Sequence, residues 1–240
     1  MVSRITIASV VTVAVQSSPM SSPMLPPTPA SYIAWNSTIR GLVVDHASDC
    51  ERRPRIADWD TNRVTDMSTL FRDQGTLCDI SQWNVFAVTD MSGMFDGAAT
   101  FNGNLNSWDA SAATSMSRMF FQAGTFNGDL SSWDVSAVTD MSYMFLQTGT
   151  FNGNLSSWDV SAVTDMRDMF HIAGPFNGDL SSWNVSAVTD MTQMFYHAAA
   201  FNGDLSSWIE VRGGSTSRDR FLKPGKYSHV TWLGGNKAKY

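Results

Sequence analysis

The chain has 240 residues and a formal net charge of −6, with 22 acidic residues against 16 lysines and arginines. This length allows a sizeable core, and the acidic balance argues against nucleic acid as a partner. No apolar run approaches the roughly 20 residues of a membrane-spanning helix. Two cysteines exclude a disulfide-dense scaffold and a multi-cysteine zinc module.

The N-terminal residues differ in composition from the rest of the chain. Residues 1–16 carry one early positive charge, Arg4, before an apolar run. This fits a signal peptide, although the run is rich in Thr and Ser. Residues 17–31 hold five prolines and no charge and are predicted to form a Pro/Ser-rich linker. Residues 32–58 are predicted to form a capping segment with a short helix, because the first repeat would otherwise expose its apolar edge.

Residues 59–208 contain six copies of a repeat of 25 residues, the first copy being one residue shorter. Each copy opens with a tryptophan, and most copies share a Met-Phe pair and a Phe-Asn-Gly turn. The opening tryptophans are Trp59, Trp83, Trp108, Trp133, Trp158 and Trp183, and Trp208 begins a seventh copy that is not completed. A fixed period of this length is typical of stacked repeats, in which each unit buries its apolar face against the next.

The copy that begins at Trp133 shows the expected structure of one unit. Trp133 and Val135 share one face of an extended segment, with the indole expected to point inward, since side chains alternate along a strand. Four side chains between Met141 and Thr148 follow at the helical spacing i, i+3, i+4 and i+7, and Gly149 ends the helix. The predicted fold class is therefore an α/β solenoid of about six strand–helix coils with a short N-terminal cap and a parallel sheet on one face.

Residues 209–240 leave the repeat pattern. They carry seven lysines and arginines against Glu210 and Asp219, and Gly and Ser dominate their start. We expect a poorly ordered basic tail, and the sequence leaves open whether this tail is native or the end of a truncated array.

Two kinds of residue point to the secretory route. Cys50 and Cys78 flank the first copy, and in an oxidising compartment they could join the cap to the repeats by a disulfide bond. The alternative is two unrelated thiols. Asn36, Asn154 and Asn184 stand in Asn-x-Ser/Thr sequences, which are acceptors for N-linked glycans in a secreted eukaryotic protein.

Aspartates recur at three positions of the repeat. The columns are Asp90, Asp140, Asp165 and Asp190; Asp109, Asp134 and Asp159; and Asp129, Asp179 and Asp204. Columns of oxygen atoms could bind calcium, but the first column is expected at helix N-termini and the others beside turns, where aspartate is favoured without any ligand. We therefore predict no cofactor and no metal site, with calcium as the alternative.

No residue is predicted to be catalytic. The four histidines, His46, His171, His197 and His229, stand in unrelated contexts, although His171 and His197 hold nearly equivalent positions and could meet at a metal ion. The nucleophile-elbow, P-loop and zinc-protease motifs are missing from the sequence. Pairs of acidic residues are copied in every repeat, which is not how a single active site is built.

The repeat W-D-V-S-x-V-T-D-M-S-x-M-F-x-x-A-x-x-F-N-G-D-L-S-S, over about residues 56–208, resembles that of the BspA-like leucine-rich-repeat surface proteins. The resemblance implies a leucine-rich-repeat-like solenoid, an extracellular or cell-surface location, and a role in adhesion or binding. It supplies no catalytic residues. The third copy departs from the pattern, since Ser115 interrupts the first aspartate column.

The expected function is that of a non-enzymatic, secreted or cell-surface repeat protein that binds a protein or glycan on a cell surface through its solenoid face. We expect no nucleic-acid partner and no transmembrane segment. The alternative is a structural spacer or wall component without a specific ligand, with or without stiffening by calcium. The sequence does not set the ligand or the oligomeric state.

Overall fold

The computed structural model describes residues 32–33, 39–41, 43, 47, 49–52, 55–75, 77–210, 231–233 and 237–239. The chain divides into two compact units, Met1–Ala30 and Ser31–Tyr240, and every described residue belongs to the second. The predicted signal peptide and linker therefore lie outside the described residues, as does most of the predicted basic tail.

Regular secondary structure among the described residues consists of short elements. Strand β1 (Tyr32–Ile33) pairs in parallel with β2 (Trp59–Asp60), and the 3-10 helix η1 (Ile56–Asp58) directly precedes β2. Residues 39–41 and 43 are helical. A second 3-10 helix is η2 (Ser206–Glu210), and β3 (Thr231–Leu233) pairs antiparallel with β4 (Lys237–Lys239). No helix in the described part of the chain has the length and apolarity needed to cross a membrane.

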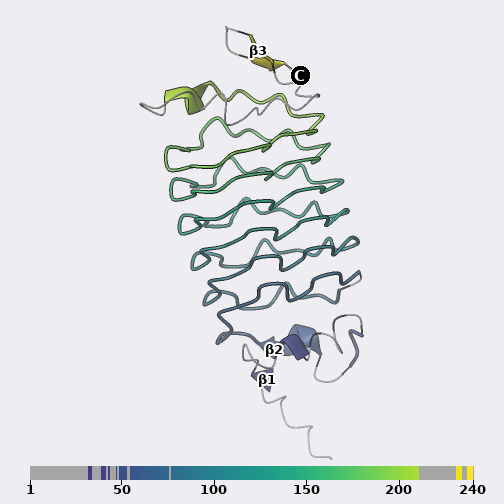
Figure 1. Ribbon diagram of the computed structural model, residues 1–240. Helices are drawn as coiled ribbons and strands as arrows, with labels where there is room; N and C mark the ends of the chain where they lie inside the picture. The colour runs from purple at the N-terminus through teal and green to yellow at the C-terminus, as the bar shows by residue number, and fades with distance from the viewer. Residues whose placement is uncertain are drawn as a thin grey trace, which may run out of the picture. The chain divides into compact units, whose positions relative to one another are not determined.

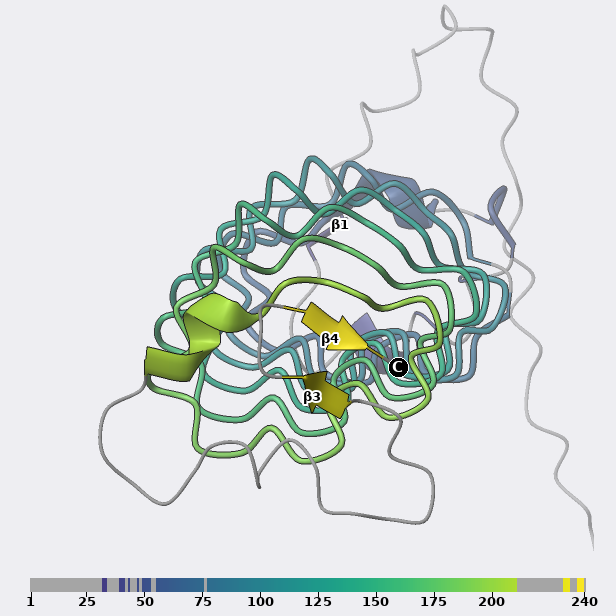
Figure 2. The same ribbon diagram turned by 90° about the horizontal axis from the view of Figure 1, so that it is seen from above.

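Between η1 and η2 the chain winds through a stack of coils, one for each repeat (Figure 1), and Figure 2 shows these coils superposed when viewed from above. Isolated parallel bridges connect the same repeat position in successive coils. The bridges join Asp66 to Asp90, Asp90 to Ser115, Ser115 to Asp140, Asp140 to Asp165, and Asp165 to Asp190. The 25-residue period in the sequence is therefore the period of the stack.

The predicted fold class, an α/β solenoid of strand–helix coils, is wrong. Residues 141–148 form consecutive turns in place of the predicted helix. The N–H of Met144 donates to the carbonyl of Met141 at 3.3 Å. Tyr143 and Gln147 have φ angles of 60° and 58°, which lie in the left-handed region and outside a right-handed helix. No described residue between η1 and η2 is helical.

The backbone N–H groups of this segment explain why it is not a helix. Those of Met141, Tyr143, Phe145 and Gln147 donate to the carbonyls of Asp165, Arg167, Met169 and His171 in the next coil, at 2.9–3.0 Å. In a helix these groups would bond within the segment. Turns of three to four residues also bring positions i, i+3, i+4 and i+7 to one side, so the spacing fits both structures. We call the segment equivalent to residues 141–148 in each coil the turn row.

The strand predicted at each tryptophan is also missing from the described coils beyond β2. The N–H of Trp133 donates to the carbonyl of Leu130 at 3.1 Å and closes a turn, and that of Val138 closes another on Val135 at 2.9 Å. The indole Nε1 of Trp133 donates to the carbonyl of Leu105 in the preceding coil at 3.0 Å. The equivalent buried bond recurs from Trp83 to Trp208, so each of these tryptophans ties its coil to the residues of the preceding repeat unit.

Columns of aromatic rings fill the interior of the stack. The ring of Phe145 lies 4.0 Å from that of Phe151 in its own coil and 5.7 Å from that of Phe120 in the preceding coil, measured between centroids. The indoles of Trp158 and Trp183 stack at 6.4 Å. The repeat-opening tryptophans are only 3–4% exposed, which confirms that they point inward. Their column therefore offers no surface for stacking against sugars.

The first coil is covered by the residues that precede it. Ile39 and Val43 are buried. Between them, Arg40 donates from Nη2 to Oδ1 of Asp66 at 2.8 Å and to Oγ of Ser68 at 2.9 Å. Its Nη1 donates to the backbone carbonyl of Ser68. The carbonyl of Ser68 thus accepts from the Arg40 guanidinium. In every later coil the equivalent carbonyl accepts from a backbone N–H of the preceding coil.

Candidate functional site

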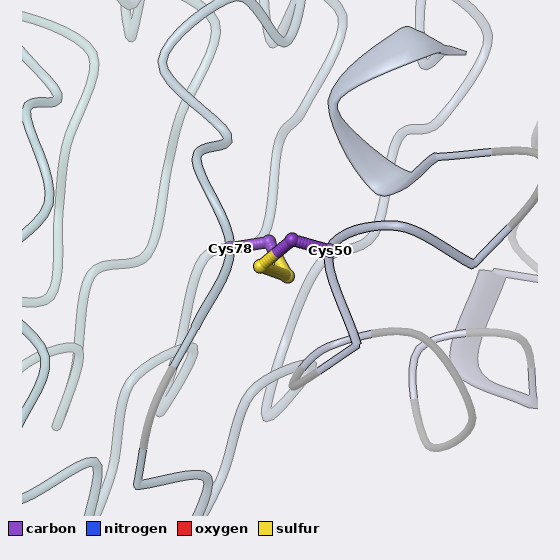
Figure 3. The surroundings of a disulfide bond; sticks show 2 residues. All are labelled: Cys50 and Cys78. Carbon is purple, nitrogen blue, oxygen red and sulfur yellow. A yellow bond between two sulfur atoms is a disulfide. The ribbon is translucent and has the colours of Figure 1, made fainter.

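Cys50 and Cys78 form a disulfide bond (Figure 3), with their Cα atoms 5.3 Å apart. The N–H of Cys78 also donates to the carbonyl of Ala47 at 2.9 Å. The bond joins the segment before the first coil to the end of the first repeat. Disulfide bonds persist in oxidising compartments and are rare in the cytosol of most organisms.

The two described glycosylation candidates, Asn154 and Asn184, are exposed. Oδ1 of Asn154 accepts from the N–H of Ser156 at 3.0 Å and from its hydroxyl at 2.8 Å. Oδ1 of Asn184 accepts from the N–H of Ser186 at 3.2 Å. Both side chains are exposed, so an attached glycan would meet no core residue. Asn36 lies outside the described residues.

The aspartate columns form turns. Oδ1 of Asp140 accepts from the N–H of Ser142 at 2.9 Å, and Asp134 and Asp129 do the same with the serine two residues later. The expectation that the first column stands at helix N-termini is wrong, because this column opens the turn rows. At four positions of the other two columns, hydrogen bonds from the serine two residues later lower the pKa of the aspartate below its ordinary value. These aspartates are Asp109, Asp129, Asp159 and Asp179. The described residues contain no group of three or more His, Cys, Asp or Glu arranged around a metal ion.

The two described histidines lie beside the same tyrosine. Nδ1 of His171 is in hydrogen-bonding contact with Oδ1 of Asp168, and its ring meets Tyr196 edge-on at 4.9 Å between centroids. The ring of His197 lies 4.2 Å from that of Tyr196. Tyr196 thus contacts both imidazoles. His46 and His229 lie outside the described residues.

The other polar columns of the stack hydrogen-bond along it. The hydroxyl of Thr139 donates to the carbonyl of Thr114 at 3.2 Å, and that of Ser157 donates to the carbonyl of Ser131 at 2.7 Å. The N–H of Asn152 donates to Oδ1 of Asn127 at 2.9 Å, and the same bond recurs up to Asn202. These columns have a structural role, because each links successive coils.

Three positions of the turn row behave differently, because each holds five or six different residue types among the six copies, more than any other position of the repeat. The first position holds Thr69, Gly93, Arg118, Tyr143, Asp168 and Gln193. The second holds Arg72, Asp96, Phe121, Leu146, His171 and Tyr196, and the third holds Asp73, Gly97, Gln122, Gln147, Ile172 and His197. We call these eighteen residues the variable face.

The turn row places the variable face on the outside of the stack. Met141, Met144 and Phe145 are fully buried, whereas Tyr143 and Leu146 are half-buried. The first and third positions have left-handed backbone, including ten residues other than glycine. This conformation costs roughly 1–2 kcal/mol per residue, and the N–H of each such residue in the first five coils donates to the next coil. The inter-coil hydrogen bonds, which the N–H groups of the first five coils donate and the carbonyls of the sixth coil accept, hold the left-handed backbone in place whatever side chain it carries.

The face carries paired charges in the first three coils. Asp96 is 4% exposed, and its Oδ2 accepts from Nε and Nη2 of Arg118 at 3.2 Å and 3.0 Å. Nε of Arg72 lies 3.9 Å from the same oxygen. The Arg118 guanidinium also lies 3.9 Å above the ring of Phe121. Because these charges compensate one another, this part of the face presents a stacked guanidinium and ring without a large net charge.

In the last three coils the face carries aromatic and aliphatic side chains beside two glutamines, two histidines and Asp168. Tyr143, Leu146 and Tyr196 are half-buried, and Ile172 is 40% exposed. Among the described residues the only other large hydrophobic side chain with such exposure is Phe86. A partner that covers these side chains would bury apolar area without having to desolvate unpaired charges.

Of these residues, the sequence analysis singled out only His171 and His197, and it did not identify the face. The signal was nevertheless in the sequence. A position-by-position comparison of the six copies separates three variable positions from the rest. Only the observed structure of the turn row shows that all three lie on the outer side.

Comparison with known proteins gives a family without an assigned activity. A family model described as "Mycoplasma protein of unknown function, DUF285" matches residues 43–148 and 126–228, which together include all but the N-terminal and C-terminal segments. No curated protein and no solved structure gives a significant match. The chain therefore belongs to this family of mycoplasma-type repeat proteins of unknown function.

Proposed function

We propose that the protein is a non-enzymatic binding protein, secreted or displayed at a cell surface, that recognises a partner protein through the variable face. One observation carries the proposal: variation among the copies is concentrated at three outward positions of the turn row. A rigid scaffold with diverse side chains on one face is suited to recognition. A stack that served only as a spacer would have no need for diversity there.

The chemistry of the face supports a protein as the partner. Tyrosine, phenylalanine and arginine are enriched in protein interfaces, and this face presents Arg118, Phe121, Tyr143 and Tyr196. The stacked pair of Arg118 and Phe121 is held in place before binding, because the guanidinium also donates to the carboxylate of Asp96 in the preceding coil. A preorganised side chain loses less conformational entropy on binding.

The disulfide between Cys50 and Cys78 supports an extracellular or surface location. The resemblance of the repeat to BspA-like surface proteins points the same way and suggests adhesion as the context. Expression in a eukaryotic secreting host tests the location. Intact mass should show a cleaved N-terminus, two hydrogens gained on reduction, and glycan mass that disappears in the Asn36→Gln, Asn154→Gln, Asn184→Gln variant. An uncleaved chain with two free thiols would contradict the proposal.

The spacer reading remains the alternative, and the hydrogen-bonded columns of Thr, Ser and Asn favour it because they stiffen the stack. The two readings differ in whether binding is saturable. Labelled full-length protein applied to arrays of extracellular protein domains and of glycans should bind saturably to a protein. The triple variant Phe121→Ser, Leu146→Ser, Tyr196→Ser should weaken that binding at least tenfold.

Phe86→Ser is the matched control, because Phe86 is 50% exposed and lies outside the variable face. It should leave the affinity unchanged. An equal loss in both variants, or no saturable binding to any protein, would contradict the proposal. Binding confined to the glycan array would also contradict it and would replace the protein partner by a sugar.

A further inference from the structure

The last coil differs from the others in its backbone hydrogen bonds. In the fifth coil the N–H groups of Met166, Asp168, Phe170 and Ile172 donate to the sixth coil at 2.8–2.9 Å. The equivalent groups of the sixth coil belong to Met191, Gln193, Phe195 and His197. Within the part of the chain that the structure describes, these four N–H groups donate to no acceptor. We call them the open edge.

The open edge keeps the conformation of the inner turn rows. Gln193 and His197 have φ angles of 56° and 57°, as their equivalents do. The turns within the row also remain closed, since the N–H of Tyr196 donates to the carbonyl of Gln193 at 3.0 Å. Met191 is 8% exposed, whereas the equivalent Met166 is fully buried. The four donors are therefore aligned before any partner arrives.

A second copy of the chain cannot stack its first coil directly on the open edge. The complementary carbonyls would be those of the first turn row, and Arg40 already donates to the carbonyl of Ser68 there. The side chains of Ile39 and Val43 are buried beside it. Head-to-tail stacking would have to displace these residues, so the two ends of the stack are not complementary.

The charge around the open edge indicates what does fit. The last two coils are acidic overall, since residues 165–210 contain five aspartates and one glutamate against one arginine, Arg167, whose Nε lies 3.9 Å from Oδ2 of Asp190. An aligned row of N–H groups can donate to the carbonyls of an extended chain, as in strand addition to a sheet edge. We propose that the open edge binds an extended, basic segment of a partner polypeptide, whose carbonyls accept the four N–H groups and whose lysines or arginines face the acidic surroundings. This goes beyond the proposed function, because backbone groups of one coil carry it.

Hydrogen exchange of the full-length protein, followed residue by residue by NMR, tests the proposal. The amides of Gln193 and His197 should exchange at least a hundredfold faster than those of Tyr143 and Gln147, which occupy the same positions in an inner coil. The peptide acetyl-(Lys-Val)5-amide should slow exchange at the edge at least tenfold and leave the inner amides unchanged. Edge amides that are already protected in the free chain, or that do not respond to millimolar peptide, would overturn it.

A pair of variants tests the role of charge. Asp190→Asn keeps the Oδ1 acceptor for the N–H of Thr192, which lies at 2.9 Å, but removes the negative charge. It should weaken peptide binding at least threefold, whereas Asp90→Asn, the same change in the second coil, should not. Binding of acetyl-(Glu-Val)5-amide as tight as that of the lysine peptide would overturn the proposal. Retention of peptide binding in a Phe121→Ser, Leu146→Ser variant would separate this site from the side chains of the variable face in the third and fourth coils.

Discussion

The inner and outer sides of the turn row follow opposite rules. On the inner side, Met and Phe recur in coil after coil and are almost completely buried. On the outer side, three positions change in nearly every copy. The backbone between them is the same throughout, because its hydrogen bonds run to the neighbouring coil and involve no side chain. The difference teaches that in this protein stability and surface chemistry are carried by separate residues of one short segment.

The largest expected effect comes from breaking an inner column. Phe145→Ala removes a ring that stacks on Phe120, Phe151 and Phe170. It should lower the free energy of unfolding by about 3–5 kcal/mol, measured by urea denaturation. Leu146→Ala, one residue further on the outer side, should cost about 1 kcal/mol or less. Equal losses would mean that the two sides of the row are not energetically separate.

The disulfide should contribute almost as much as one inner ring. Cys50→Ser opens a link between residues 28 positions apart, for which the loop-closure estimate is about 3–4 kcal/mol. Thermal unfolding followed by circular dichroism should show a lower midpoint. Dithiothreitol should produce the same shift in the natural chain and no further shift in the variant. A reductant effect that persists in the variant would contradict this assignment.

A smaller effect should follow from shortening the asparagine column. Asn152→Ala removes the Oδ1 that accepts the N–H of Asn177 at 2.8 Å. The loss should be about 1 kcal/mol, again from urea denaturation. Asn202→Ala is the control, since Oδ1 of Asn202 accepts no hydrogen bond among the described residues. If both variants lost the same amount, the inter-coil bond would not be the cause.

The smallest expected effect concerns the left-handed positions. Gln193→Gly relieves a φ of 56° but gives the unfolded chain more freedom, so stability should change by no more than about 0.5 kcal/mol. Ser186→Gly, at an exposed residue of the same coil without positive φ, should cost roughly 0.5–1 kcal/mol. A larger loss at Gln193 would show that its side chain supports the fold.

Part of this organisation could be predicted from the sequence. The period, the inward tryptophans and the stacking of one repeat on the next all follow from the spacing of large apolar residues. The local structure does not follow, because Met141, Met144, Phe145 and Thr148 have a spacing that suits both a helix and a row of turns. What decides between them is the direction of N–H groups such as that of Tyr143, which no side-chain pattern reveals.

The candidate site was out of reach for the same reason. With a helix in place of the turn row, the sequence indicates for His171 and His197 only nearly equivalent positions at which they could meet at a metal ion. Once Tyr143 and Gln147 are known to be left-handed, their positions and that of Leu146 are seen to lie together on the outside. The residues at the three variable positions then form one continuous surface, whereas in the sequence they are scattered.

The one-to-one register of the coils has a consequence for how such a chain can change in length. Each bridge joins positions one repeat apart, as from Asp140 to Asp165, and each indole reaches only the preceding coil. Removal of residues 133–157 would bring Trp158 against the carbonyl of Leu105, which has the same surroundings as the carbonyl it now uses. In-frame loss or duplication of whole repeats by recombination would therefore conserve the packing and change only the length and order of the outward residues.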